Sequence, residues 1–304
     1  MRKFLLFLLT RLSTPFWGRG IVAKVPIINR LYYSIFLSLN NTQTVLFEVG
    51  GVKMFGQSRS TLSQRLVSIG KYEEETTKLF NEILRDGMVV LDIGANIGYF
   101  SLIAAARVGE SGKVFSFEPS KESFLLLSKN IKLNGYANVV PVEKAISKNV
   151  SKQQFFLVND PASNSLFRDA SGELSQATVE VETTTIDIFM RQYEINVDLV
   201  KMDVEGAETD VLDGMENTIR NNPNLKIITE FSPRVLERCN HEPSAFLKKL
   251  AGYGFGLQVI DDEKKTRYAI TPANIDNVIR TTYARYPVPI NIFCDRNSKQ
   301  NIDV

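Results

Sequence analysis

Short apolar runs alternate with segments of helical spacing along most of the chain after residue 70. The clearest strand candidate is residues 89–93, an apolar run of the kind that a strand buried on both faces carries. A glycine turn follows, and residues 99–108 then resume with helical spacing and small, alanine-rich side chains. Such alternation demands a mostly parallel, doubly wound sheet, so the predicted fold class is α/β and Rossmann-like. The further predicted strands are residues 113–117, 139–145, 197–202, 225–229, 257–260 and 290–294, and the further predicted helices are residues 72–84, 120–134, 186–193, 207–220 and 246–250.

Two segments depart from this alternation. Residues 1–40 are predicted to form one or two basic, aromatic-rich helices that break at prolines, and two strand-like runs then flank Gly50-Gly51, a pair that permits the positive φ angles of a tight β-hairpin. Residues 153–184 change to short alternating runs around a long polar loop, which predicts an inserted β-hairpin. We therefore expect a basic helical segment with a β-hairpin cap over residues 1–70 and a main domain over residues 71–304.

The turn after the first strand candidate carries the main chemical signal. It reads Asp92-Ile93-Gly94-Ala95-Asn96-Ile97-Gly98, and its two glycines let the backbone turn tightly and approach a ligand closely. A dinucleotide-binding turn has the order G-x-G-x-x-G, and its middle glycine is missing here. A carboxylate two residues before the first glycine would repel a pyrophosphate but suits an ammonium or a sulfonium. S-adenosylmethionine carries both cations, so the charge of Asp92 favours this methyl donor.

A second acid is found where a nucleoside ligand would need it. Residues 113–117 end in Glu118-Pro119, where a carboxylate at a strand tip can accept hydrogen bonds from both hydroxyls of a ribose. Taken alone, Asp92 could equally cap a helix, and Glu118 could be a solvated turn residue. The joint spacing of the two acids favours a shared ligand.

Three motifs in this order resemble the FkbM family of S-adenosylmethionine-dependent methyltransferases. They are D-x-G-A-N-x-G at residues 92–98, F-E-P at 117–119 and K-M-D-V-E-G-A-E at 201–208, and the similarity covers residues 72–231. The resemblance implies the class I methyltransferase fold, S-adenosylmethionine as the cofactor, and O-methylation of a hydroxyl on a sugar, glycolipid or secondary metabolite. On this basis the expected donor-binding residues are Asp92, Gly94, Ala95, Asn96, Gly98, Glu118 and Pro119.

The resemblance also implies contacts in two further segments. Enzymes of this fold touch the adenine at the end of the third strand, which here is Ala145. Family members carry a small-polar segment before a leucine near the active site, and Ser163, Asn164 and Ser165 are similar to it, so they are candidate substrate contacts. An ordinary surface loop is the alternative interpretation of this segment.

Asp92, Glu118, Asp203 and Glu230 are predicted at the carboxyl ends of the first, second, fourth and fifth strands of the main domain. Ligands bind at this edge in such sheets. Methyl transfer to a hydroxyl requires a positioned nucleophile and a base that removes its proton. The only histidine, His241, is predicted in a surface loop beyond the fifth strand. Asp203 is therefore the first candidate for the base, and Glu205 and Glu230 are the further catalytic candidates.

Asp203 has two alternative roles. Neighbouring strand tips lie about 4.8 Å apart, so if the fourth and fifth strands adjoin, Asp203 and Glu230 could hold a Mg²⁺ that acidifies the substrate hydroxyl. Asp203 and Glu205 could also cap the following helix and complement its dipole. No metal ligand is firmly predicted.

Composition and charge limit the kind of protein and the partners to be expected. A chain of 304 residues that is 44% hydrophobic can bury a full core. Its first 47 residues contain six basic residues and no acid, whereas the body is slightly acidic and has no basic stripe with interleaved aromatics. Nucleic acid is therefore not an expected partner, whereas a small-molecule or glycan acceptor is expected.

The apolar block at residues 4–9 is too short for a signal peptide or a membrane span, so a cytoplasmic location is expected.

The basic tail and the overall function each keep alternatives. Residues 1–40 have the make-up of an interfacial helix that would hold the protein peripherally at the inner membrane face, and equally of a helical lid over the sheet. The competing functions are a nicotinamide-dependent Rossmann oxidoreductase and a non-catalytic scaffold that keeps the methyltransferase fold. The sequence pattern predicts no oligomeric state.

Overall fold

The computed structural model describes residues 44–168, 170–172, 175–286 and 288–296. It divides into two compact units, Met1–Tyr72 and Glu73–Val304. The helices expected over residues 1–40 lie outside the described residues, so both roles of the tail stay predictions. Within the described part of the chain, no helix is long and apolar enough to span a bilayer.

The smaller unit contains the expected β-hairpin. Strands β1 (Thr44–Val49) and β2 (Val52–Gln57) pair antiparallel, and Gly50 and Gly51 form the turn with φ angles of 58° and 83°. Both angles are in the region that favours glycine, so the pair allows the two-residue turn. Helix α4 (Thr61–Ile69) follows, and the sequence analysis missed it.

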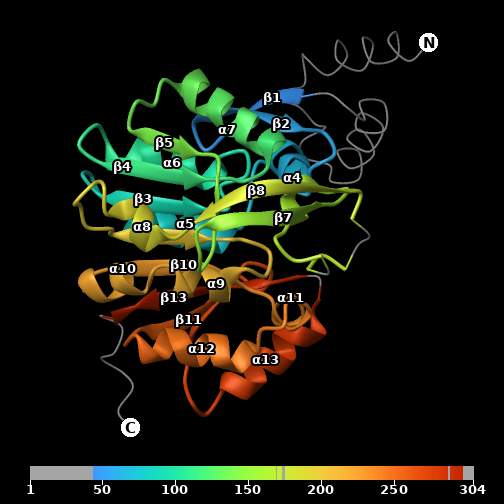
Figure 1. Cartoon of the computed structure of the whole chain (residues 1–304), viewed down its shortest axis with the longest axis vertical. Helices are drawn as coiled ribbons and strands as arrows, with labels where there is room; N and C mark the ends of the chain where they lie inside the picture. The colour runs from blue at the N-terminus through green and yellow to red at the C-terminus, as the bar shows by residue number, and fades with distance from the viewer. Residues whose placement is uncertain (1–43, 169, 173–174, 287, 297–304) are drawn as a thin grey trace. The chain divides into compact units, whose positions relative to one another are not determined.

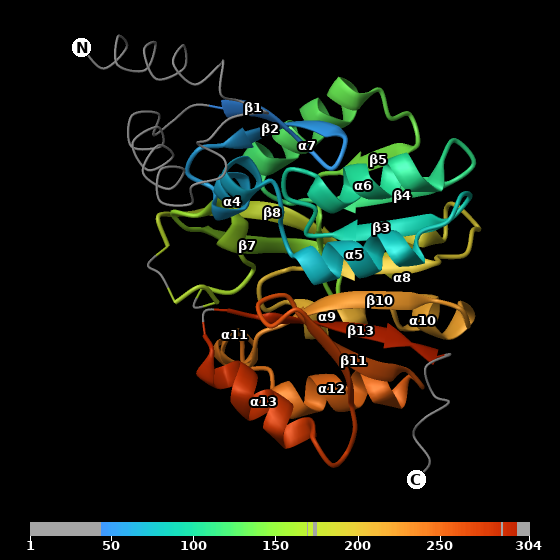
Figure 2. The same cartoon turned by 180° about the vertical axis from the view of Figure 1, so that it is seen from behind.

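The larger unit is built on one eight-stranded sheet with the order β12-β11-β13-β10-β9-β3-β4-β5 (Figures 1 and 2). The five strands from β10 to β5 pair in parallel, whereas the pairings that involve β11, β12 and β13 are antiparallel. This confirms the predicted α/β class with a mostly parallel sheet. The strands are β3 (Val89–Ile93), β4 (Lys113–Phe117), β5 (Val139–Val142), β9 (Leu199–Met202), β10 (Lys226–Phe231), β11 (Gly256–Asp261), β12 (Thr266–Ile270) and β13 (Ile290–Asp295).

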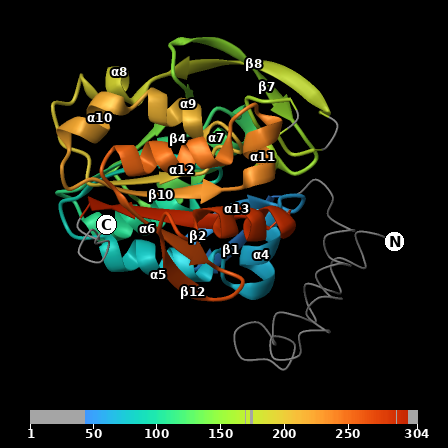
Figure 3. The same cartoon turned by 90° about the horizontal axis from the view of Figure 1, so that it is seen from below.

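Helices cover both faces of this sheet. In Figure 3, α5 (Glu74–Ile83) and α6 (Tyr99–Val108) lie on one side of the strands, and α10 (Glu216–Asn221) and α12 (Pro243–Gly252) lie on the other. A strand covered on both faces is apolar throughout, which explains the continuous apolar runs in the sequence. The remaining helices of this unit are α7 (Lys121–Asn134), α8 (Ile186–Met190), α9 (Glu208–Asp213), α11 (Pro233–Arg238) and α13 (Ile275–Ala284), with the short 3₁₀ helix η1 (Pro161–Ser163).

The inserted hairpin forms a small sheet of its own. Strands β7 (Ser151–Leu157) and β8 (Ala177–Thr184) pair antiparallel, and β6 (Ala145–Ile146) pairs in parallel with β8. The expectation of one strand over residues 139–145 was therefore wrong. The chain turns after Val142, where the backbone nitrogen of Lys144 donates to the carbonyl oxygen of Val142 at 3.0 Å, and it then enters the second sheet.

The single helix expected over residues 207–220 is also wrong. It breaks into α9 and α10 at Gly214, where a Cβ would overlap the backbone oxygen of Ser147. Gly214 thus lets the chain pass close to the loop that follows β6, and Met215, with a φ of −129°, leaves the helical conformation. The sequence analysis also missed α11, β12 and α13, and β12 is a mostly exposed edge strand with little apolar signal.

Candidate active site

The glycine turn joins the carboxyl ends of three strands. Gly94 and Gly98 have φ angles of 82° and 95°, and a Cβ on Gly94 would overlap the carbonyl oxygen of Asp203. Only glycine lets the tips of β3 and β9 come this close. The backbone nitrogens of Gly94 and Ala95 both donate to the carbonyl oxygen of Phe117, at 3.0 and 2.9 Å, which ties the turn to β4 as well.

Asp92 lies behind this turn. It is 3% exposed and accepts a hydrogen bond from the hydroxyl of Ser101 on α6, whose oxygen is 2.7 Å from that of Ser116 on β4. Burial raises the pKa of Asp92 to about 6, against the opposing effect of the Ser101 hydrogen bond. Asp92 therefore anchors α6 to the sheet, and direct contact between its carboxylate and a methyl donor stays a prediction.

Glu118 follows β4 and lies at the wall of a pocket. Its Oε2 accepts a hydrogen bond from the backbone nitrogen of Asn96, and its Oε1 accepts one from that of Ser120, both at 2.8 Å. Burial raises the pKa of Glu118 to about 7, although both backbone hydrogen bonds favour the ionised form. Each carboxylate oxygen offers two acceptor positions, so one on each remains for a ligand hydroxyl.

The pocket contains about 510 Å³ of empty space, part of it open to solvent. The insertion contributes one wall through residues such as Pro161 and Leu166. Among the described residues expected from the sequence, those that line the pocket are Gly94, Asn96, Glu118, Pro119, Ala145, Asn164, Asp203 and Glu205. The other expected residues, Asp92, Ala95, Gly98, Ser163, Ser165 and Glu230, are not part of its lining.

The insertion is fastened to the acidic motif by Ser165. This residue is 2% exposed, and its hydroxyl donates to the backbone oxygen of Glu205 at 2.7 Å. The side-chain oxygen of the adjacent Asn164 accepts from the backbone nitrogen of Val158 at 2.9 Å, which orders the loop from within. Ser165 therefore holds the pocket wall against the acidic motif from outside the pocket lining.

Three carboxylates gather where β9 and β10 end. The two strands adjoin in parallel with Met202 opposite Thr229, which places Asp203 beside Glu230, and Glu205 follows in the next turn. One oxygen from each carboxylate lies within 4.8 Å of the others. Burial first, and then the neighbouring carboxylates, hold the pKa of Glu205 and that of Glu230 well above the usual range.

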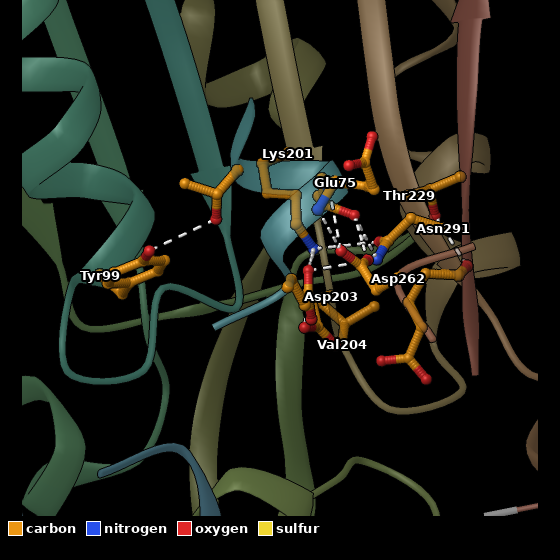
Figure 4. Close-up of polar contacts among 12 residues, drawn as sticks. Glu75, Tyr99, Lys201, Asp203, Val204, Thr229, Asp262 and Asn291 are labelled. Atoms are coloured by element: carbon orange, nitrogen blue, oxygen red, sulfur yellow. Dashed lines mark hydrogen bonds and ion pairs between the residues drawn. The ribbon is translucent and has the colours of Figure 1, made fainter. Parts of the chain in front are cut away.

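Lys201 supplies the positive charge of this cluster (Figure 4). Its side chain is 1% exposed, and its Nζ lies 3.6 Å from Oδ2 of Asp203 and 3.9 Å from Oε2 of Glu73. The same nitrogen is 5.0 Å from the centre of the Phe100 ring. Burial alone would lower the pKa of Lys201, but the surrounding carboxylates, Glu73 first, outweigh it and raise the pKa above its usual value.

Polar contacts from β13 and α5 fix Lys201 in place. Asn291 on β13 lies with its Oδ1 3.4 Å from the Lys201 ammonium, and its amide nitrogen donates to Glu73 and Thr76, both at 3.1 Å. The Thr76 hydroxyl in turn donates to Oδ2 of Asp262 at 2.6 Å. The sequence analysis missed all five of these residues as site residues, although a lysine inside an apolar strand run was a usable signal for Lys201.

The turn between β9 and α9 is held by Glu208, another residue that the sequence analysis missed. Its Oε1 accepts hydrogen bonds from the backbone nitrogens of Val204 and Gly206, at 3.2 and 3.3 Å. Burial raises the pKa of Glu208 to about 7. Helix α9 has no side-chain cap hydrogen bond, so the capping role considered for Asp203 and Glu205 is not seen, and Glu205 adopts a φ of 52° within the turn.

Fold and site together define an α/β protein with a ligand pocket at the carboxyl edge of a parallel sheet. Residues 92–257, more than half of the chain, match the family described as methyltransferase FkbM domain. The chain belongs to this family.

Named relatives match over part of their length. Hexuronic acid methyltransferase AglP from Haloferax volcanii is 27% identical over 149 residues, which cover 49% of this chain and 58% of the relative. Methyltransferase sdnD from Sordaria araneosa is 26% identical over 156 residues, which cover 42% of this chain and 60% of the relative. The chain thus spans about three fifths of the length of these relatives. A solved S-adenosylmethionine-dependent O-methyltransferase from Thermotoga maritima gives a TM-score of 0.42 at 14% identity and covers 87% of this chain and 81% of that one.

We expect Glu118→Ala to weaken the binding of S-adenosylmethionine roughly tenfold to a hundredfold. The variant loses a charged hydrogen-bond acceptor, which contributes about 1.5–3 kcal/mol. Calorimetric titration with the donor measures the change. Glu122→Ala, which alters an exposed acid in the first turn of α7, is the matched control and should bind like the wild type. Equal donor affinity in the wild type and the Glu118 variant would contradict the prediction that Glu118 binds the donor.

We expect Lys201→Met to lower the free energy of unfolding by about 3–5 kcal/mol, because it leaves buried carboxylates without their counter-charge. A buried carboxyl whose pKa is raised in the folded protein destabilises the fold only at pH values at which the same carboxyl is ionised in the unfolded chain. The loss should therefore grow as the pH rises above the normal carboxyl range and should shrink toward about pH 4.

Urea unfolding across that pH range measures the effect of Lys201→Met. Lys248→Met removes an exposed lysine on α12 and should change stability little at any pH. A loss for the Lys201 variant that does not vary with pH would show that its charge does not balance the acids.

Proposed function

We propose that this protein is an S-adenosylmethionine-dependent methyltransferase that methylates a hydroxyl of a sugar, glycolipid or secondary metabolite. The observation that carries this proposal is the shared pocket, which is lined both by Glu118 beside the glycine turn and by Asp203. The first group suits a nucleoside donor and the second suits a hydroxyl acceptor. Membership of the FkbM family supports the transfer of a methyl group, and one relative is named a hexuronic acid methyltransferase.

In this proposal the donor binds along the ends of β3 and β4. The ribose hydroxyls donate to the free acceptor positions of Glu118, and the turn at Gly94 and Asn96 lies against the methionine portion. Ala145 and the neighbouring Ile146 line the pocket where an adenine ring would fit between the sheet and the insertion. The family offers no support for a nicotinamide-dependent oxidoreductase, and the intact turn gives none to a non-catalytic scaffold.

Asp203 is the proposed general base. Methyl transfer is an in-line displacement, so the protein has mainly to position the hydroxyl and accept its proton. Asp203 lines the pocket and has the Lys201 ammonium 3.6 Å from its Oδ2, which holds the carboxylate in place. Glu205 and Glu230, whose pKa values are raised, are the neighbours with which the proton would be shared.

Asp203→Asn should lower turnover at least about 100-fold and leave donor affinity unchanged. The variant keeps the shape of the side chain and removes its ability to accept a proton. Methyl transfer from labelled S-adenosylmethionine to a panel of hexoses, hexuronates and their nucleotide-linked forms measures turnover. Asp276→Asn changes an exposed acid on α13 and serves as the control. Unchanged turnover in the Asp203 variant would assign Asp203 to a structural role.

A bound divalent cation is the second arrangement of the same acids. Asp203, Glu205 and Glu230 bring their oxygens within 4.8 Å of one another, and Mg²⁺ binds hard oxygen ligands of this kind. The cation would lower the pKa of a bound hydroxyl and so replace part of the work of the base. It would also compete with Lys201 for the carboxylate of Asp203.

Chelation decides between the two arrangements. With Asp203 as a base and no metal, added EDTA should leave turnover unchanged, and Mg²⁺ should raise the melting temperature of the wild type no more than that of Glu230→Gln. Loss of turnover that Mg²⁺ restores, together with a Mg²⁺-dependent rise in melting temperature that Glu230→Gln abolishes, would favour the metal.

A further inference from the structure

Arg234 on α11 is held in place by aromatic rings. The centre of its guanidinium lies 4.6 Å from the centroid of the Tyr283 ring and 5.5 Å from that of Tyr286. Both tyrosines come from the end of α13 and the residues just after it. A guanidinium stacked on ring faces keeps its N–H groups in its own plane, where they point past the rings.

No described residue pairs with these N–H groups. Arg234 has no hydrogen bond or ion pair within the described part of the chain, and its Nε is buried without a partner. The nearby Arg238 differs, because its Nη1 donates to the Tyr286 hydroxyl at 2.7 Å. Arg285, at the end of α13, likewise pairs with Asp261 at 2.6 Å. Arg234 is thus an oriented cation whose strongest interactions are unused, and a buried unpaired donor is unfavourable.

Arg234 lies at the same edge of the sheet as the proposed active site. Its helix begins directly after β10, the strand that carries Glu230. The following residue, Val235, packs on the acidic turn, since a Cβ on Gly206 would lie 3.0 Å from its Cγ1. Val235 also clusters with Phe167 of the insertion, the residue after the pocket-lining Leu166. Arg234 is not itself part of the pocket lining, but its helix begins at the same edge of the sheet and packs on the acidic turn through Val235.

We propose that Arg234 binds an anionic group, a carboxylate or a phosphate, on the methyl acceptor. This inference rests on the proposed function and specifies its substrate class. A planar guanidinium recognises both anions through paired, in-plane hydrogen bonds. The carboxylate of Asp203 would repel such an anion. The anionic end of the acceptor therefore goes to Arg234, and the neutral hydroxyl end goes to Asp203.

The test is a set of binding titrations with the full-length protein in the presence of S-adenosylhomocysteine. Glucuronate, glucose 6-phosphate and glucose serve as the carboxylate, phosphate and neutral probes, and NMR line broadening measures each affinity. We expect the wild type to bind at least one anionic probe at least about tenfold more tightly than glucose. Arg234→Gln should abolish this preference, and Arg234→Lys should keep only part of it, because lysine keeps the charge without the planar fork.

Arg280→Gln is the matched control, because Arg280 is an exposed arginine on α13 whose Nη2 donates to Asn277 at 3.0 Å. It should retain the preference for the anionic probe. Wild-type protein without a preference for either anion, or an Arg234→Gln variant that keeps it while folded, would overturn the proposal. Which anion binds distinguishes a carboxylate from a phosphate acceptor. Calorimetry with S-adenosylmethionine on the same proteins tests the proposed function separately. If the donor does not bind, the proposed function fails; if the donor binds but no anion is preferred, only the role of Arg234 fails.

Discussion

The buried ammonium of Lys201 is the interaction on which the site depends. Carboxylates from a strand tip, a neighbouring strand and the start of α5 all lie around it, and Asp203 and Glu73 are within 3.6 and 3.9 Å of its Nζ. Without a central cation, acids this close would repel one another more strongly, and the pKa values of Glu205 and Glu230, which are already raised, would rise further. The charge of one lysine thus allows the sheet to present an acidic cluster at its carboxyl edge.

The donor side and the acidic side of the pocket are joined through backbone rather than side chains. Gly94 has no Cβ, so the turn after β3 packs directly on the carbonyl oxygen of Asp203. The backbone nitrogen of Asp203 also donates to the carbonyl oxygen of Ile93 at 2.9 Å. A donor placed on the glycine turn is therefore at a set distance from the Asp203 carboxylate, which is the geometric requirement of an in-line transfer.

The sequence predicted those parts of the site that depend on local order. Glu118 and Asp203, which line the pocket, follow from where the apolar runs of β4 and β9 end, because parallel strands share one carboxyl edge. Asp92 and Glu230 lie within β3 and β10 and are outside the pocket lining. The residues that hold Lys201 in place could not be predicted in this way. Asp262 accepts from the backbone nitrogen of Glu75 across 187 residues, and Asn291 reaches the site only because β13 pairs antiparallel with β10. No periodicity encodes such pairings, which depend on how distant segments pack.

The insertion links the pocket wall to the acidic turn. Glu205 adopts a φ of 52°, a conformation unfavourable for a residue with a side chain, and the hydrogen bond from Ser165 to its carbonyl oxygen stabilises that conformation. The same loop lines the pocket through Asn164 and Leu166. A change in the insertion therefore alters two things at once, the shape of the pocket and the turn that carries Glu205. One hydrogen bond, from Ser165 to Glu205, thus positions both the pocket wall and the turn.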